Sequence, residues 1–204
     1  MSSDHDDDLE LTIRHKTATG LSGVGFQVWR GSLFLADYLL AHPGSVRSKT
    51  ILEIGSGTGL TSITALLAGP KRILATDLPS QIHLIRENLA GNSKMLKTFI
   101  TDTVDFQALA LDVTKNEPFE NIAESILDEI DVVLCADVVY DEDITKGEDP
   151  DCSFTKIAKI YFFLKGVSKR LARLCCCRKA ASKNCQSRIF LTFRTVLSSC
   201  GSPI

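Results

Sequence analysis

The sequence predicts a three-layer α/β/α fold built on a mostly parallel sheet. Two observations predict it. From Thr50 onward, short apolar segments alternate with segments of helical periodicity. A glycine-rich turn follows the first apolar segment, and an acid ends the second. Strands that alternate with crossover helices form a parallel sheet that is covered on both faces.

The N-terminal residues precede this alternation. Residues 1–10 carry five acids without periodicity and are predicted as a disordered acidic tail. The stretch 11–28 is ambiguous, because its glycines suggest turns between short extended pieces. Residues 29–41 predict a helix, since apolar side chains recur at helical spacing and Pro43 stops it.

The alternating elements follow in chain order, predicted from apolar runs, helical periodicity and turn residues. Asp77 closes the second strand, and a basic, cysteine-rich loop separates the last helix from the last strand. The expected strands cover 50–54, 72–76, 106–112, 131–136 and 188–193. The expected helices cover 60–67, 79–91, 118–126 and 151–174. One domain over 11–194 is therefore predicted, with an irregular tail over 195–204.

Composition restricts the class of protein further. The 204 residues are 44% hydrophobic, which is enough for one sizeable core, and 23 basic side chains nearly balance 25 acidic ones. This balance excludes a polybasic nucleic-acid coat and a disordered acidic chain. No apolar run approaches the roughly 18 residues that cross a bilayer, and the acidic start is unlike a secretory signal. We expect a soluble protein without a membrane partner.

The seven cysteines do not form the pattern of a disulfide framework. Their number is odd, and Cys175, Cys176 and Cys177 are adjacent. We expect reduced thiols and hence a cytoplasmic or nuclear protein. Because the cluster lacks the paired spacing of zinc ligands and the histidines are distant in sequence, no metal site is predicted.

The clearest chemical motif is the segment LEIGSGTG, residues 52–59. Its glycines Gly55, Gly57 and Gly59 allow a tight turn and let backbone amides approach a ligand at a helix N-terminus. Asp77, after the next strand, can accept both hydroxyls of a ribose. These features predict a nucleoside-cofactor site, although the glycine spacing departs from the dinucleotide fingerprint. The alternative is a turn that binds no ligand.

Several motifs together resemble a known family. The chain carries, in the order and spacing of the family 16 methyltransferases, the segments VWRGSLFLADYL, LEIGSGTGL, TDLPSQIHLIRENLAGN and ADVVYDED. The resemblance covers roughly residues 25–194. It implies the seven-strand, Rossmann-like fold of protein-lysine methyltransferases, S-adenosylmethionine as the cofactor, and a lysine of a non-histone protein as the acceptor.

The resemblance also suggests which residues hold the cofactor. The glycine turn and Asp77 would bind it, with support from Glu53, Trp29 and Asp112. Trp29 also fits a core position on its helix. Asp112 would accept the adenine amino group, although Val113 stands where relatives tend to have tryptophan. Asn88 is equally compatible with a place on the helix surface.

The family's DxxY motif falls on Asp137 and Tyr140, at the carboxyl end of the fourth strand. Open α/β sheets bind ligands at this end, so both residues should face the same crevice as the glycine turn. We expect Asp137 to hold and orient the incoming amine, and Tyr140 to add a polar contact and an aromatic wall. The alternative is that Asp137 caps a loop and Tyr140 packs in the core.

Charge is unevenly distributed along the chain. Residues 102–151 contain sixteen acids and two lysines, whereas residues 152–204 contain eleven basic residues and no acid. The basic segment predicts a solvated surface, or a patch for an acidic protein partner or, weakly, nucleic acid. No aromatic residues alternate with its basic cluster over 170–188, so we do not expect a nucleic-acid stacking platform.

The C-terminal end leads to an alternative function. The resemblance implies an antiparallel pair of strands after the fifth, and the small, polar residues 195–204 cannot supply it. The fifth strand would then be left as a bare edge. The alternative is a truncated, catalytically inactive methyltransferase-fold protein that acts as a binding module.

Overall fold

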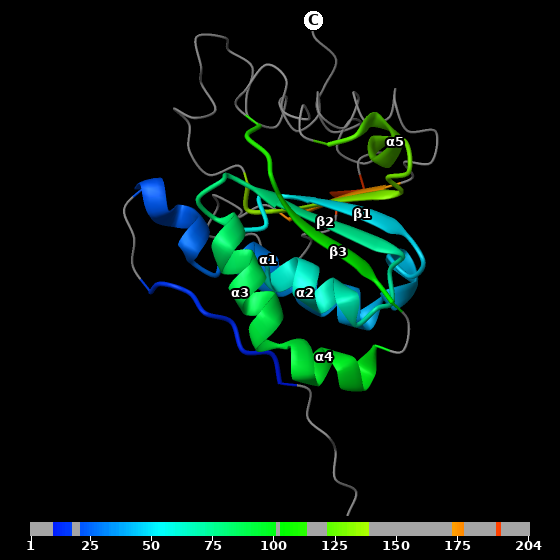
Figure 1. Cartoon of the computed structure of the whole chain (residues 1–204), viewed down its shortest axis with the longest axis horizontal. Coiled ribbons are helices and arrows are strands. Elements are labelled where there is room, and N and C mark those ends of the chain that lie inside the picture. The colour runs from blue at the N-terminus through cyan, green and yellow to red at the C-terminus, as the bar shows by residue number, and fades with distance from the viewer. Residues whose placement is uncertain are drawn as a thin grey trace, which may run out of the picture.

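The computed structural model describes residues 10–17, 21–100, 103–113 and 122–138, and the backbone of 173–177 and 191–192. The strands of its sheet are β1 Thr50–Ile54, β2 Arg72–Asp77, β3 Asp105–Ala110, β4 Val132–Ala136, β5 Arg173–Cys177 and β6 Leu191–Thr192. They form one sheet in the order β3-β2-β1-β4-β5-β6, seen in Figure 1. Every pairing from β3 to β5 is parallel, and β6 is antiparallel to β5.

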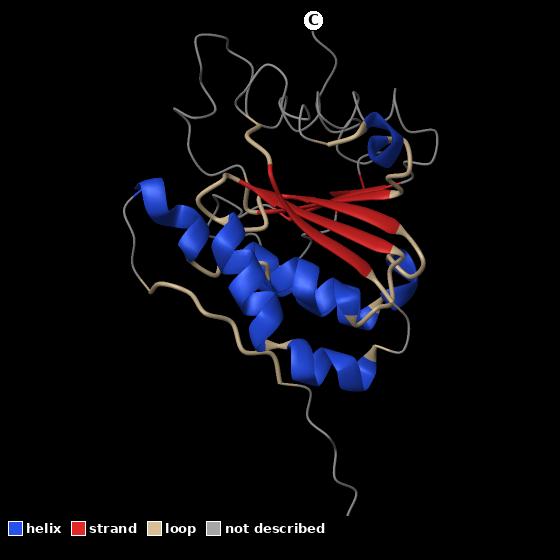
Figure 2. Ribbon diagram, in the orientation of Figure 1, coloured by secondary structure: helices blue, strands red, loops and turns tan. Residues whose placement is uncertain are grey.

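The helices cover both faces of this sheet. They are the 3-10 helices η1 Leu21–Phe26 and η2 Pro43–Ser45, and the α-helices α1 Arg30–Ala41, α2 Leu60–Leu66, α3 Ile82–Gly91, α4 Ser93–Phe99 and α5 Glu124–Leu127. Figure 2 shows α1 to α4 on one side of the strands and α5 on the other. Of the helices in the described residues, none is both long enough and apolar enough to span a membrane.

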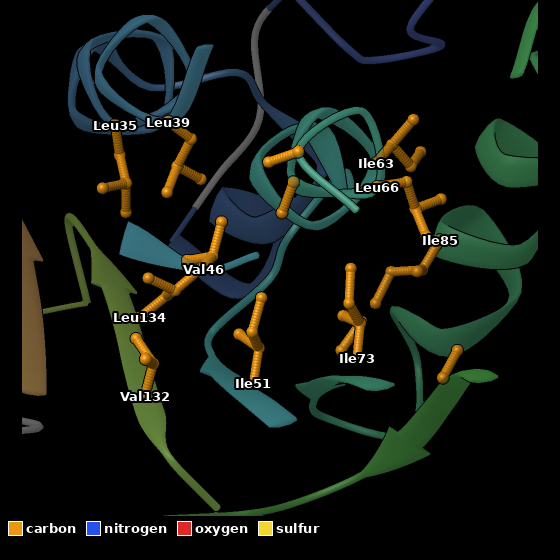
Figure 3. Packing of buried hydrophobic residues seen from close by; sticks show 14 of the residues in the cluster. Leu35, Leu39, Val46, Ile51, Ile63, Leu66, Ile73, Ile85, Val132 and Leu134 are labelled. Atoms are coloured by element: carbon orange, nitrogen blue, oxygen red, sulfur yellow. The ribbon is translucent and has the colours of Figure 1, made fainter. Parts of the chain in front are cut away.

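The core has one layer on each face of the sheet. On the side of α1 to α4, Ile51, Ile73 and Leu134 point from the strands toward Leu35 and Ile63 of the helices, as Figure 3 shows. The alternate strand positions pack on the opposite face, together with α5: Leu52, Leu74, Val133 and Cys135. Burial on both faces explains why these strands are almost continuously apolar in sequence.

The predicted α/β fold class is confirmed. The first strand has the expected bounds, and the second and fourth differ from the prediction by one residue at one end. The third strand is shifted, to Asp105–Ala110, and α3 begins three residues later than predicted. Helix α4 is absent from the prediction, because seven residues are too few for a clear periodicity.

The prediction is wrong for residues 173–177, which were expected as a helix end and a cysteine-rich loop and form β5. Strand β6, at 191–192, lies within the expected strand 188–193, whose other residues are outside the described ones. Cysteine behaves as a small apolar residue, so this run suits a strand. The strand expected to form an edge, 188–193, contains β6, which pairs with β5 and is the last strand of the described sheet. The other residues of the expected helix over 151–174, and the tails 1–9 and 195–204, lie outside the described residues.

The N-terminal residues 10–17 are extended and run beside α3, at the dark blue end of the chain in Figure 1. Leu11 and Ile13 pack against the core, whereas Thr12 and Arg14 are exposed. This alternation is that of a strand with one buried face. The ambiguous stretch 11–28 is therefore an extended segment in its first part and the short helix η1 further on.

Candidate functional site

The carboxyl ends of the parallel strands meet at one edge of the sheet. Ile54 of β1 is paired with Thr76 of β2 on one side and with Cys135 of β4 on the other. Asp77 is paired with Ala110, the last residue of β3. The glycine turn, Asp77, Asp112 and Asp137 therefore follow neighbouring strand ends, which is the ligand-binding edge expected of such sheets.

The glycine turn has a backbone that only glycine adopts without strain. Gly55, Gly57 and Gly59 have φ angles of 69°, 54° and 82°. A Cβ atom at Gly55 would collide with Val138, and one at Gly57 would lie 3.1 Å from the carbonyl oxygen of Gly25. The turn is thus closely enclosed by the segment after β4 and by η1.

Asp77 joins the second strand to the glycine turn. Its Oδ2 accepts a hydrogen bond from the Gly57 amide at 2.6 Å, and its Oδ1 accepts one from the Leu78 amide at 2.7 Å. Burial raises the pKa of Asp77, and the two backbone hydrogen bonds oppose this shift by stabilising the carboxylate. Each carboxylate oxygen can accept more than one hydrogen bond, so Asp77 keeps acceptor capacity for a ligand.

Glu53 belongs to β1 and is 1% exposed. Ser62 of α2 donates a hydrogen bond to Glu53 Oε2. Burial raises the pKa of Glu53 to about 7, although the nearby hydroxyls of Ser62, Ser56 and Thr61 lower it. Thr76 also donates to the Glu53 carbonyl oxygen at 2.6 Å. Glu53 therefore connects β1 and β2 with the helix that follows the glycine turn.

Trp29 immediately precedes α1 and is half-buried. Its indole Nε1 donates to the carbonyl oxygen of Val24 in η1 at 2.9 Å. The neighbouring residue Gly25 is the one whose carbonyl faces Gly57. The alternative interpretation of the sequence, in which Trp29 occupies a core position of the helix, is thus wrong. It holds η1 against the glycine turn.

Asp137 follows β4 and binds the N-terminus of α1. Its φ angle is 51°, and its Oδ2 accepts a hydrogen bond from the Gly31 amide at 2.6 Å. A carboxylate is favourable there because the first amides of a helix lack partners within it. A Cβ atom at Gly31 would lie 2.7 Å from Asp137 Cγ, so only glycine permits the contact.

The other oxygen of Asp137 is a candidate contact for a ligand. Asp137 Oδ1 is buried, and no other described residue forms a hydrogen bond with it. Asp137 therefore does act as a cap, but of a helix rather than of a loop, and with one acceptor left over. An orphaned buried acceptor of this kind costs free energy unless something pairs with it.

The remaining predicted residues are less well defined. Asp112 is half-buried two residues beyond β3, next to Leu111, whose amide donates to the Asp77 carbonyl oxygen at 2.8 Å. Tyr140 lies outside the described residues. Within the described ranges, no group of three His, Cys, Asp or Glu side chains is arranged to hold a metal ion.

Further buried polar atoms surround the turn. The Oε1 atom of Gln81 has no hydrogen-bond partner in the described part of the chain, whereas the hydroxyls of Ser56 and Thr61 lie near the Glu53 carboxylate. With the glycine turn and a carboxylate at the end of β2, the Gln81 oxygen suits a polar ligand that enters from the edge of the sheet. This combination of a glycine turn and acceptor oxygens fits a nucleoside.

Some residues at the site are not predicted by the sequence. Gly31 is required by its contact with Asp137, and Gly25 lies against the Gln81 side chain; both partners are far along the chain. Asn88 is 1% exposed and not a surface residue of its helix. The signal for Asn88 was its spacing of four from Asn92, which puts two amides on the same helix face.

Comparison with known proteins identifies the family. A family model described as lysine methyltransferase matches residues 5–147. The chain belongs to this lysine methyltransferase family. The match agrees with the family resemblance in the sequence, which is confirmed.

Individual relatives are consistent with this family. The chain is 36% identical to mouse methyltransferase-like protein 22 over 145 residues, which cover 67% of this chain and 37% of that protein. It is 34% identical to the human protein of that name over 163 residues, or 76% of this chain and 39% of the relative.

A second group of relatives also matches. The human electron transfer flavoprotein beta subunit lysine methyltransferase is 34% identical over 116 residues, covering 57% of this chain and 38% of that protein. The chain thus spans less than two fifths of the length of each of these three relatives.

Proposed function

We propose that this chain binds S-adenosylmethionine and transfers its methyl group to a lysine side chain of a non-histone protein. Membership of the lysine methyltransferase family supports the reaction. The observation that carries the proposal is the hydrogen bond between the Gly57 amide and Asp77, because it joins the glycine turn and the acid of β2 into one site. Neither feature alone would be specific.

The cofactor-binding role rests on the edge of the sheet. S-adenosylmethionine would supply an electrophilic methyl group on a sulfonium. In this proposal its methionine tail lies against the backbone of the glycine turn, and Asp77 has acceptor capacity for the ribose hydroxyls. In this proposal Asp112 accepts the adenine amino group, Glu53 supports the turn from below, and Trp29 holds η1 over it.

Asp137 is proposed to position the acceptor. Its Oδ2 is held by the Gly31 amide, so Oδ1 has a fixed direction and lacks a partner among the described residues. Oδ1 can accept a hydrogen bond from the lysine ammonium and then from the amine, with Tyr140 as a second contact in this proposal. Methyl transfer needs the neutral amine, whereas free lysine has a pKa of about 10.4.

Asp137 does not itself promote that deprotonation. A neighbouring carboxylate stabilises the ammonium and so raises the pKa of the lysine. Desolvation of the amine, or water, must therefore remove the proton, while Asp137 fixes its orientation. Orientation alone is a large effect, because misplacing a reacting atom by about 1 Å can cost roughly a hundredfold in rate.

Transfer of a labelled methyl group tests the proposal. The purified chain is incubated with S-adenosylmethionine carrying a labelled methyl group and with a cell extract, and the labelled residue is identified by mass spectrometry. The wild type should label lysine. Asp77→Ala should abolish the label, whereas Asp37→Ala, which removes an exposed aspartate on α1, should not. Label on another residue type, or equal labelling by both variants, would contradict the proposal.

Further partners and the compartment also remain proposals. For the basic residues of 152–204 we propose an acidic protein partner, and a cytoplasmic or nuclear location for the chain. Co-elution with an acidic protein that is lost as salt rises from 50 to about 300 mM would support the first, since exposed charges are screened at that ionic strength. Salt-independent co-elution would contradict it.

A further inference from the structure

Asn88 of α3 and Asn92, the residue directly after α3, bind the N-terminal extended segment through its backbone. Asn88 Oδ1 accepts from the Arg14 amide at 2.8 Å, and Asn88 Nδ2 donates to the Arg14 carbonyl oxygen at 3.1 Å. Asn92 does the same with Thr12, at 2.9 and 2.8 Å. Each side-chain amide thus pairs with a residue of the segment as a neighbouring strand would.

The spacing of these pairs follows from geometry. Four residues of an α-helix advance about 6 Å, and two residues of a strand advance about 6.6 Å. Amides at positions 88 and 92 therefore match alternate residues 14 and 12. Figure 1 shows the segment running along α3 accordingly.

Asn88 differs from Asn92 in its third hydrogen bond. Asn88 Nδ2 also donates to the carbonyl oxygen of Thr58 at 2.8 Å, inside the glycine turn. The third bond of Asn92 goes to the Asn88 carbonyl oxygen of α3 at 2.7 Å. Both side chains are buried, with 1% and 3% exposure. Among the hydrogen bonds of these two amides, only one therefore reaches the turn.

We propose that Asn88 is a positioning residue that couples the docked segment 10–17 to the glycine turn, so that this segment tunes the affinity for S-adenosylmethionine. The inference rests on the proposed cofactor role of the turn. It extends that role to Asn88 and the segment 10–17, which are remote from the strand ends, because they would help to set the affinity for the cofactor.

The physical reason lies in the flexibility of the turn. Three glycines with positive φ surround Thr58, and glycine has the greatest conformational freedom of any residue. A turn that is not held populates conformations that cannot bind. The apparent dissociation constant then rises in inverse proportion to the fraction that is competent. The Asn88 bond to the Thr58 carbonyl raises that fraction.

The matched variants Asn88→Asp and Asn92→Asp test this coupling. Each keeps one acceptor oxygen for the segment and loses both N–H donors. Both positions are buried, Asn88 within α3 and Asn92 at its C-cap. Titration calorimetry gives the dissociation constant for S-adenosylmethionine, and thermal unfolding gives the melting temperature. We expect the melting temperature to fall in both variants. The dissociation constant of Asn88→Asp should be about fivefold or more above that of Asn92→Asp.

Equal dissociation constants in the two variants would overturn the inference. If Asn88 had a purely structural role, its variant would lose stability without a weaker affinity than the Asn92 variant. If a buried carboxylate prevents folding, Asn88→Ala and Asn92→Ala provide the same comparison with neutral side chains. A folded wild type that binds no S-adenosylmethionine would overturn the proposed function together with this inference. The two failures are therefore distinguishable.

Hydrogen exchange provides a reciprocal test on the wild-type chain. Coupling between two sites acts equally in both directions, so the cofactor must also stabilise docking of the segment. S-adenosylmethionine should slow exchange of the Arg14 amide, which Asn88 binds, more than that of the Thr12 amide. In Asn88→Ala this difference should vanish. Unchanged exchange of Arg14 at saturating cofactor would contradict the coupling.

Discussion

The two carboxylates at the ligand-binding edge, Asp77 and Asp137, are held differently. Both oxygens of Asp77 accept backbone hydrogen bonds, one of them from the glycine turn. Asp137 has one oxygen bound to the α1 amide of Gly31 and one without a partner among the described residues. We call the part of the site around Asp77 the cofactor side and the part around Asp137 the acceptor side. The carboxylate of the cofactor side is fixed by backbone amides at both oxygens, whereas that of the acceptor side keeps one oxygen that can accept a hydrogen bond from a substrate.

The two sides also touch each other. Gly55 belongs to the glycine turn and Val138 to the segment that carries Asp137, and there is no room between them for a single methyl group. A change at this contact affects both sides at once.

Gly55→Ala should destabilise the fold most. The new Cβ atom would collide with Val138, and the residue would keep a φ of 69°. Together, the collision and the strained backbone should cost about 4 kcal/mol in the free energy of unfolding, measured with urea. The control is Gly69→Ala, which has a φ of 70° but open space around its Cβ position, and should cost about 1 kcal/mol. Equal losses would contradict the described contact.

Glu53→Gln should remove a pH dependence of stability on the cofactor side. The pKa of Glu53 is raised from 4.5 to about 7 by burial, so the unfolded chain releases this proton first as pH rises. Stability should therefore fall by about 3 kcal/mol between pH 4.5 and 7, and then level off. Glu53→Gln, which stays neutral, should lack this decrease, whereas the exposed Glu124→Gln should keep it. A wild type that gains stability over this range would refute the assignment.

Asp137→Asn should separate the acceptor side from the cofactor side. The amide oxygen can still cap α1, but the charge that holds the lysine ammonium is lost. We expect lysine methylation to fall roughly a hundredfold, while the dissociation constant for S-adenosylmethionine changes less than about twofold. Labelled-methyl transfer and titration calorimetry measure the two quantities. Retained methylation would remove Asp137 from the acceptor site.

Trp29→Phe should have the smallest effect. It keeps the aromatic ring but removes the hydrogen bond to the Val24 carbonyl oxygen, which costs about 1 kcal/mol in unfolding free energy. Because η1 then lies less firmly over Gly57, cofactor affinity should weaken about threefold, as measured by calorimetry. Unchanged affinity with lowered stability would restrict Trp29 to a structural role.

The predictable parts of the molecule are those determined locally. The apolar run 50–54, the glycine turn and the position of Asp77 follow from neighbouring residues, and the structure places them as predicted. Gly31 is required by Asp137, 106 residues away, and Asn88 by Arg14, 74 residues away. These contacts between distant residues form only when the chain folds, so the local sequence does not predict them.

Strand β5 was mispredicted for a related reason. The run of cysteines in β5 is compatible with a loop or a strand, and its pairing with β4 decides between them. A local pattern of basic residues and cysteines cannot show that a parallel strand 41 positions earlier provides a partner, as Val132 does for Arg173.

The central claim, that the glycine turn and Asp77 bind S-adenosylmethionine, is tested most directly by titration calorimetry of the whole chain with this cofactor. We expect saturable binding at one site by the wild type and by Asp37→Ala, and its loss in Asp77→Ala. A folded wild type without binding, or Asp77→Ala with unchanged affinity, would contradict it. The first of these results would favour a binding module with a methyltransferase fold.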